Sequence, residues 1–184
     1  MNDISNELGI SKKTLYTFIK DKSELVEKAV LFIEHETQQR IELILHKDYN
    51  SIDQLFEVVK AIIVAVKDLN PVKEHDLKKF YPDIYLNIIN LRRQFIYKVI
   101  INNIRQGKKE GLYRRGLNEE IIARLHLSRI ERIQEDKVFS VEEYTSPRSF
   151  TEIFKYHIRG IANEKGIEIL EKKMKLLNKT TTKV

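Results

Sequence analysis

Apolar residues recur at spacings of three and four positions along most of this chain, which is the period of an amphipathic α-helix. No segment alternates apolar and polar residues in the manner of a half-buried strand. Six glycines and three prolines among 184 residues leave few points at which a helix must stop. The sequence therefore predicts an all-α fold.

Capping residues, glycines and prolines divide this pattern into separate helices. Ser11, Asp21 and Asn118 are suitable N-caps. Ser51 repeats the capping signal, and Gly9 suits the left-handed residue that ends a helix. The expected helices cover about residues 3–8, 11–19, 21–45, 51–66, 74–80, 82–106, 118–134, 148–164 and 167–177, with a loop at 136–147.

The composition excludes several classes of protein. The formal net charge of +6 permits an anionic partner such as nucleic acid, but it also suits an ordinary soluble protein. The absence of cysteine excludes disulfides, thiolate metal sites and a cysteine nucleophile. The chain has no run of about 18 apolar residues and no signal-peptide pattern, so we expect a cytoplasmic protein with no membrane partner.

No catalytic or metal-binding constellation stands out in the sequence. His35 begins the letters HETQQ, but a zinc motif of this kind needs a second histidine where Gln39 stands. The glycines around position 111 are not followed by the Gly-Lys-Ser/Thr of a phosphate loop. We therefore expect no enzyme activity, no metal and no cofactor.

The opening stretch has the pattern of a helix-turn-helix. A short helix, a turn containing Gly9 and a second helix beginning at Ser11 follow one another within residues 3–19. Small polar side chains in the first turn of the second helix can enter the major groove of DNA, and the positive end of that helix favours phosphate. Residues 11–22 hold four lysines against one aspartate, a local charge of +3. The alternative is a capped pair of helices that merely packs.

The residues DISNELGISKKTLYTFIKDKSELV resemble the opening of the tetracycline-repressor (TetR) family of transcriptional regulators. The similarity rests on the turn Leu8–Ser11 and on the segments Leu15–Phe18 and Lys22–Leu25. The resemblance implies a recognition helix at residues 11–18. By the same resemblance, the side chains that face DNA are those of Ser11, Lys12, Lys13, Thr14, Tyr16, Thr17 and Lys22.

Within that set the resemblance implies different roles. Thr14 with Lys12 or Lys13 would approach the bases. Tyr16 and Lys22 would hold phosphates. Leu15 and Phe18 are expected in the core of the head.

One difference from the family concerns the start of the chain. The family places a complete helix before this motif, whereas the sequence begins at Met1 with the helix that corresponds to the second. Ile4, Leu8 and Leu15 would then expose apolar surface, at about 25 cal/mol per Å², and loosen the head. We favour a start that lies inside a longer gene product, because the motif is otherwise intact. True loss of the helix is the alternative.

The expected architecture has two parts. Residues 1–46 form a helix-turn-helix head, with its first helix missing from this chain, and a connecting helix. Residues 47–184 form a helical ligand-binding and dimerisation domain. By family resemblance, candidates for lining a small-molecule pocket are Phe56, Ile63, Phe80, Tyr81 and Tyr85, although each also suits ordinary core packing.

The two C-terminal helices at about 118–134 and 148–164 are expected to form the dimer by resemblance to the family, as a four-helix bundle with a second copy. The interface candidates are Ile121, Leu125, Phe154, His157, Ile158 and Ile161, although a monomer core shows the same periodicity. The basic run from Arg92 to Arg115 is either a functional surface or, more simply, a solvated face.

These expectations together describe a transcriptional regulator that acts as a repressor. Two recognition helices of a homodimer would lie about 34 Å apart to meet successive major grooves of operator DNA. A small-molecule inducer that changes this spacing would release the protein. The alternative is a helical ligand-binding or protein-interaction dimer that has lost DNA binding.

Overall fold

The computed structural model describes residues 1–68, 71–135 and 139–181 of the chain. Over these residues helices follow one another and no strand forms, so the predicted all-α fold is confirmed. The helices are α1 (Asn2–Glu7), α2 (Lys12–Leu15), α3 (Lys22–Leu45), α4 (Ser51–Asp68), α5 (Pro71–Phe80), α6 (Pro82–Lys109), α7 (Glu119–Glu135), α8 (Val141–Tyr144), α9 (Pro147–Ile161) and α10 (Glu164–Thr181).

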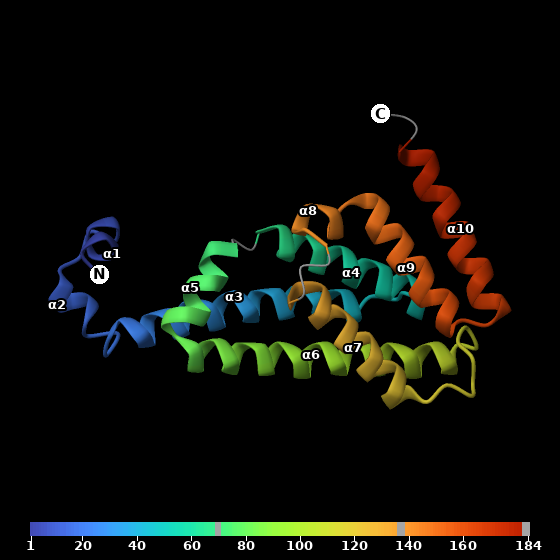
Figure 1. Cartoon of the computed structure of the whole chain (residues 1–184), viewed down its shortest axis with the longest axis horizontal. Helices are drawn as coiled ribbons and strands as arrows, with labels where there is room; N and C mark the ends of the chain where they lie inside the picture. Colours follow the sequence, from blue (N-terminus) through green and yellow to red (C-terminus); the bar gives the residue numbers. More distant parts are fainter. Residues whose placement is uncertain (69–70, 136–138, 182–184) are drawn as a thin grey trace.

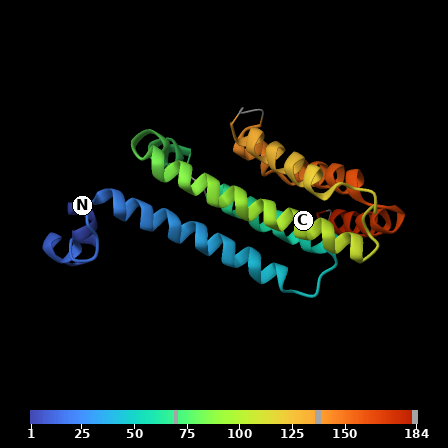
Figure 2. The same cartoon turned by 90° about the horizontal axis from the view of Figure 1, so that it is seen from below.

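The helices are arranged as a small head on a long body. Helices α1 and α2 pack on each other at one end of the molecule, and α3 leads from them into the body (Figure 1). Helix α3 packs on α4 and α6, and α6 also packs on α5 and α7. Helices α9 and α10 pair at the end of the body far from the head (Figures 1 and 2). The head therefore connects to the body through one long helix.

The largest apolar core of the body lies where α4, α9 and α10 meet. Phe56 on α4 makes edge-to-face contacts with Phe150 and Phe154 on α9, with ring centroids 5.1 and 5.2 Å apart. Ile158 and Leu170 are fully buried in the same cluster. Burying aromatic rings removes a large apolar area from water, so this junction contributes much of the stability of the body.

A buried polar network joins α4 to the end of α6. The Asn103 amide donates hydrogen bonds to the Ser51 carbonyl at 2.8 Å and to the Gln54 side-chain oxygen at 3.2 Å. The Tyr113 hydroxyl donates to the Asn103 oxygen at 3.0 Å, and burial raises the pKa of this phenol. The Glu110 carboxylate accepts from the Ser51 backbone amide at 2.8 Å. These bonds satisfy groups that would otherwise be buried without partners, so they fix how the two helices meet.

Three expected helix boundaries are corrected. Asn50, not Ser51, caps α4, because the Asn50 side-chain oxygen accepts from the amides of Ile52 and Asp53. The expected loop at 136–147 contains the helical turn α8, which Ser140 caps by accepting from the Glu143 amide at 3.1 Å. Helix α9 ends at Ile161 rather than near residue 164, since Ala162 has extended backbone. The expected cap at Asn118 is confirmed by its bond to the Ile121 amide.

Candidate nucleic-acid interface

The first two helices form a helix-turn-helix whose turn depends on Gly9. Its φ of +64° lies in the left-handed region, where glycine avoids the strain that a side chain would meet. The Gly9 and Ile10 amides donate back to the carbonyls of Asn6 and Ser5 at the end of α1. The chain thus reverses within a few residues, as the sequence predicts, and places α2 directly after the turn.

Helix α2 is capped by Ser11 but is shorter than expected. The Ser11 hydroxyl oxygen accepts from the Thr14 amide at 3.0 Å and also lies 2.9 Å from the Thr14 hydroxyl. The α-helix covers Lys12–Leu15 and not the whole expected segment to residue 18. The amides of Thr17 and Phe18 donate three residues back, so the chain continues as a tighter turn.

This shortening explains one error in the expected core of the head. Leu15 and Ile19 are buried, at 5% and 6% exposure, but Phe18 is 71% exposed. After the α-helix ends at Leu15, the tighter turn rotates Phe18 outward and brings Ile19 inward. The expectation for Leu15 as an exposed residue is also wrong, whereas Ile4 and Leu8 are exposed as expected.

The polar residues of the turn and of α2 form one accessible surface. All of the side chains that the sequence assigns to DNA contact are exposed: Ser11, Lys12, Lys13, Thr14, Tyr16, Thr17 and Lys22. The hydroxyls of Ser11, Thr14 and Thr17 are already held by bonds within the turn, since the Thr17 hydroxyl donates to the Thr14 carbonyl at 2.7 Å. Lysine side chains can reach phosphate oxygens from such a rigid support. Their contact with DNA stays a prediction.

The junction between head and body is held by two capping hydrogen bonds. Asp21 accepts from the Glu24 amide at 2.9 Å, and the Glu24 carboxylate accepts from the Lys20 amide. Lys28 pairs with Glu24 at 2.8 Å and donates to the Phe18 carbonyl at 3.2 Å. The hydrogen bond from Lys28, together with that from Lys20, lowers the pKa of Glu24. The end of the head is therefore tied to the first turn of α3.

Helix α3 is anchored in the body by an ion pair that the sequence did not reveal. Its 24 residues extend about 36 Å, and Glu34 in its middle accepts two hydrogen bonds from the Arg92 guanidinium on α6. Burial is the largest single influence on Arg92 and lowers its pKa, but the hydrogen bond from Arg92 to Glu34 and the attraction of nearby acidic groups, Glu34 first, together outweigh it, so the pKa is raised. The partners lie 58 positions apart, so no local pattern could have paired them. Arg92 is thus an exception to the solvated face expected for the basic run.

The five pocket candidates do not gather at one place. Phe56 is 3% exposed in the core at α9, whereas Phe80 is 61% exposed at the end of α5. Ile63, Tyr81 and Tyr85 are partly buried. The bond between Asn103 and Ser51 shows that the start of α4 meets the end of α6, so Phe56 and Tyr81 lie at opposite ends of α6. Together they cannot line one small pocket.

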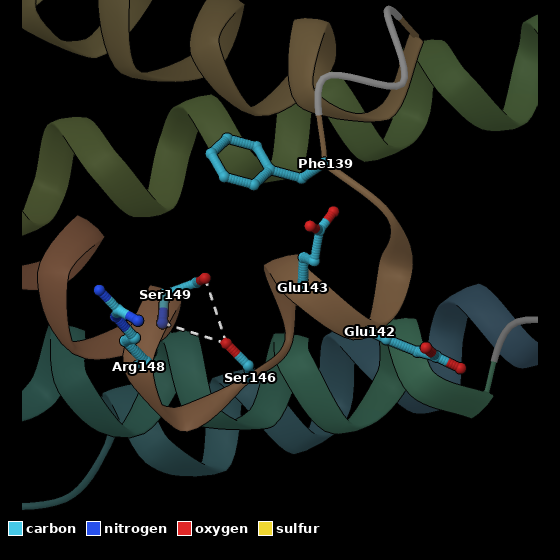
Figure 3. A pocket seen from close by; sticks show the side chains of 6 residues that line it. All are labelled: Phe139, Glu142, Glu143, Ser146, Arg148 and Ser149. Atoms are coloured by element: carbon cyan, nitrogen blue, oxygen red, sulfur yellow. Dashed lines mark hydrogen bonds between the residues drawn. The ribbon is translucent and has the colours of Figure 1, made fainter.

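A pocket that the sequence did not suggest opens beside α8 and the start of α9. Its lining residues are Phe139, Glu142, Glu143, Ser146, Arg148 and Ser149 (Figure 3). Ser146 is fixed as the cap of α9 because its hydroxyl accepts from the Ser149 amide at 3.2 Å. The Glu143 side chain points toward the Phe139 ring (Figure 3). The Ser140 backbone amide donates to Glu143 and lowers the pKa of that carboxyl, which keeps it ionised.

The interface candidates divide between surface and core. Ile121 and Leu125 on α7 are 63% and 65% exposed. Phe154, Ile158 and Ile161 on α9 are buried inside the chain's own core, so they offer no surface to a second copy. This is the monomer packing that the same periodicity allows.

One ring nitrogen of His157 is already engaged inside the chain. Its Nδ1 lies 2.9 Å from Nδ1 of His126 on α7, and the ring centroids are 4.0 Å apart. Of the six candidates, Ile121 and Leu125 are therefore the apolar residues that remain exposed, and dimerisation itself stays a prediction.

Comparisons with known proteins bear on this architecture. No model of a known protein family matches the chain. A curated protein of Bacillus subtilis (strain 168), the uncharacterized HTH-type transcriptional regulator YvaF, is 23% identical over 164 residues, which cover 88% of this chain and 84% of that protein. A solved transcriptional regulator from Cytophaga hutchinsonii has a TM-score of 0.69 at 15% identity, over 89% of this chain and 88% of the other. A tetR-family regulatory protein from Rhodococcus RHA1 has a TM-score of 0.58 at 21% identity, over 86% and 83% of the two chains.

The fold and its exposed head define an all-α protein with an N-terminal helix-turn-helix. This is the fold of the TetR family of transcriptional regulators, as the resemblance of the opening residues predicts. The two solved proteins that share this fold are described as a transcriptional regulator and a regulatory protein of the tetR family. In the part of the chain that the structure describes, no helix combines the length and apolar character needed to cross a bilayer.

Proposed function

We propose that this protein is a DNA-binding transcriptional regulator that acts as a repressor and leaves its operator when a small-molecule inducer binds the body. The observation that carries the proposal is the exposed basic surface of the turn and α2 on a rigid, capped support. The similarity to a protein named as an HTH-type transcriptional regulator over 88% of the chain supports it. Its place of action is the cytoplasm, where the operator lies.

DNA recognition in this proposal needs two copies of the chain. A single four-residue recognition turn offers few contacts, so a twofold dimer would read two half-sites about 34 Å apart. The exposed Ile121 and Leu125 on α7 are the apolar residues that we assign to the interface. Burying them against a second copy would remove them from water.

Helix α3 would carry the inducer's effect to the head. It is tied to the head by the Asp21 cap and to the body by the Glu34–Arg92 ion pair. A ligand that shifts α6 relative to α4 would therefore move α3 and change the distance between the two recognition turns. Binding of inducer and of operator would then oppose each other.

The proposal is tested by titrating the protein against DNA from upstream of its own gene, using fluorescence anisotropy at two salt concentrations. The double variant Lys12→Ala/Lys13→Ala should bind at least about tenfold more weakly. The slope of log affinity against log salt concentration should become shallower, by about 0.9 for each of the two lysines that contacts a phosphate.

The matched control is Lys98→Ala/Lys172→Ala, which removes the same charge from exposed positions on α6 and α10. It should bind DNA like the unchanged protein. Equal losses in both variants would mean that only net charge matters, and the head would not be the reading surface. Absence of binding by a folded, unchanged protein would overturn the proposed function.

A further inference from the structure

A cluster of nitrogen-containing side chains, those of His126, Arg129 and His157, lies between α7 and α9. His126 is buried on α7, with 9% exposure, and faces the partly buried His157 on α9. Nη2 of Arg129, one turn further along α7, lies 3.2 Å from Nδ1 of His126. The hydroxyl-bearing rings of Tyr144 on α8 and Tyr156 on α9 lie within electrostatic range of this guanidinium. Three helices thus converge on one arginine.

The hydrogen-bond geometry leaves this cluster with too many donors. Arg129 can only donate, so Nδ1 of His126 must be an acceptor. The facing Nδ1 of His157 then carries its proton and donates to the same nitrogen at 2.9 Å. One lone pair therefore faces two donors. In addition, Nε of Arg129 is buried and has no hydrogen-bond partner.

The charge of the cluster is also unbalanced. Burial lowers the pKa of His157 to about 3 and holds the pKa of His126 well below its usual value, so both rings are neutral and Arg129 supplies the positive charge. No ion pair joins Arg129 to a carboxylate whose side chain the structure describes. In the sequence, the positions three and four residues away from Arg129 hold no acidic residue either. Among the residues whose side chains the structure describes, this partly buried cation therefore has no counter-ion.

We propose that Arg129, His126 and His157 form a binding site for a small monocarboxylate. A carboxylate oxygen would accept from the orphaned Nε and a second from Nη2 in the bidentate geometry that guanidinium favours. One negative charge would match the single positive charge of the cluster, whereas a doubly charged phosphate would not be neutralised. Arg129 is only partly buried and Tyr156, within electrostatic range of it, is 77% exposed, so a ligand approaches the guanidinium from solvent and uncovers the buried Nε as it binds.

A metal ion fits the same residues poorly. Two neutral imidazoles could ligate a cation, but the adjacent guanidinium would repel it. Over the described residues, no group of three or more histidine, aspartate or glutamate side chains is placed to hold a metal. The donor excess instead matches an anion.

If the proposed function holds, the inducer is a small monocarboxylate that binds at this site. Helix α7 packs on α6, which carries the Arg92 partner of α3, so the site is connected to the head through two helix contacts. The regulatory role rests on the proposed function, whereas carboxylate binding itself does not.

The test is calorimetric titration of the full chain with benzoate and with benzamide, a neutral molecule of nearly the same shape. Benzoate should bind saturably and benzamide should not. The variant Arg129→Met should bind benzoate at least about tenfold more weakly, because charge-assisted bonds are lost. The matched control Arg124→Met removes an exposed arginine from the same helix and should leave the affinity unchanged. Equal binding of both molecules, or full affinity in Arg129→Met, would overturn the proposal.

Nuclear magnetic resonance of ¹⁵N-labelled histidines provides a second readout that needs no variant. Benzoate should shift the ¹⁵N resonances of the ring nitrogens of His126 and His157, and benzamide should leave these resonances unchanged. A second outcome is that neither molecule shifts the histidine resonances and that sedimentation shows the Arg129→Met variant to be a smaller oligomer than the unchanged protein. In that case the partner of Arg129 is an acidic side chain of a second copy, and the small-molecule site is overturned.

Anisotropy with operator DNA separates this inference from the proposed function. If benzoate binds but the unchanged protein binds no DNA, the carboxylate site stands and the regulator proposal falls. If DNA binds and benzoate does not, the carboxylate site falls alone.

Discussion

The head and the body of this protein are stabilised over different distances along the chain. In the head, the bonds that fix the turn and α2 join residues three to five apart, such as Ser11 with Thr14 and Ile10 with Ser5. In the body, Asn103 bonds to Ser51 across 52 positions and Glu110 to Ser51 across 59. The head therefore holds its shape through local capping, whereas the body depends on contacts that form only when distant helices meet.

The same difference appears in the apolar side chains. The head buries Leu15 and Ile19 but leaves Leu8 and Phe18 largely exposed. The body buries continuous clusters, including the ring of Tyr113, which has no exposed surface. We expect substitutions in the body to change global stability, and substitutions in the head to change DNA binding with little effect on the unfolding of the whole protein.

The largest effect is expected from Gly107→Ala, which would break the close approach of α6 to Tyr113. A Cβ at Gly107 would lie 2.1 Å from the nearest atom of the Tyr113 ring, so the ring and its network with Asn103 must shift. Overpacking of this kind should lower the free energy of unfolding by about 3 kcal/mol, measured by urea denaturation. Gly116→Ala is the control, because a Cβ there meets no atom within 4 Å. Similar stability of the two variants would contradict a rigid contact.

An effect of similar size is expected from acid, and it should also be confined to the body. The pKa of His157 is about 3 and that of His126 is also lowered, in both cases chiefly by burial. Between the unfolded value near 6.5 and these folded values, the unfolded state binds more protons. The free energy of unfolding should therefore fall as pH decreases below about 6.5, by up to about 1.4 kcal/mol per pH unit for each histidine.

Urea denaturation at pH 7, 6 and 5 measures this slope. His157→Gln should reduce the loss, since one buried group no longer needs to be protonated on unfolding. His35→Gln is the matched control, because His35 is exposed on α3 and should not affect the slope. A slope that is the same in all three proteins would show that the histidine pair does not control acid stability.

The features that can be predicted from the sequence are those that depend on local bonds. The caps at Ser11, Asp21 and Asn118 and the turn at Gly9 were predicted correctly, because each bond is made within a few residues. The outward position of Phe18 was missed because the chain tightens after Leu15, and the helical period no longer applies.

The contacts across helices could not be predicted from periodicity. An apolar stripe on α9 shows which face is buried, but not whether its neighbour is α4 of the same chain or a second copy, so Phe154 and Ile158 were assigned to an interface. The pairing of His126 with His157 and of Glu34 with Arg92 likewise depends on which helices meet. The capped turn and α2 can therefore be predicted from the sequence, whereas the ion pair that connects α3 to the body cannot.

The smallest effect on stability is expected from Ser11→Ala in the head. The change removes the acceptor of the Thr14 amide and should cost about 1 kcal/mol of local stability. Because α2 packs mainly on α1, the urea midpoint of the body should stay the same, while hydrogen exchange of the α2 amides should become faster. Affinity for DNA should fall, since the turn that presents Lys12 and Lys13 is less ordered.

Ser140→Ala, which removes the equivalent cap of α8, is the control and should leave both α2 exchange and DNA affinity unaltered. Faster hydrogen exchange in α2 with unchanged DNA affinity would mean that the turn becomes ordered only when DNA binds. The proposal that the head presents a preformed DNA-binding surface would then be wrong.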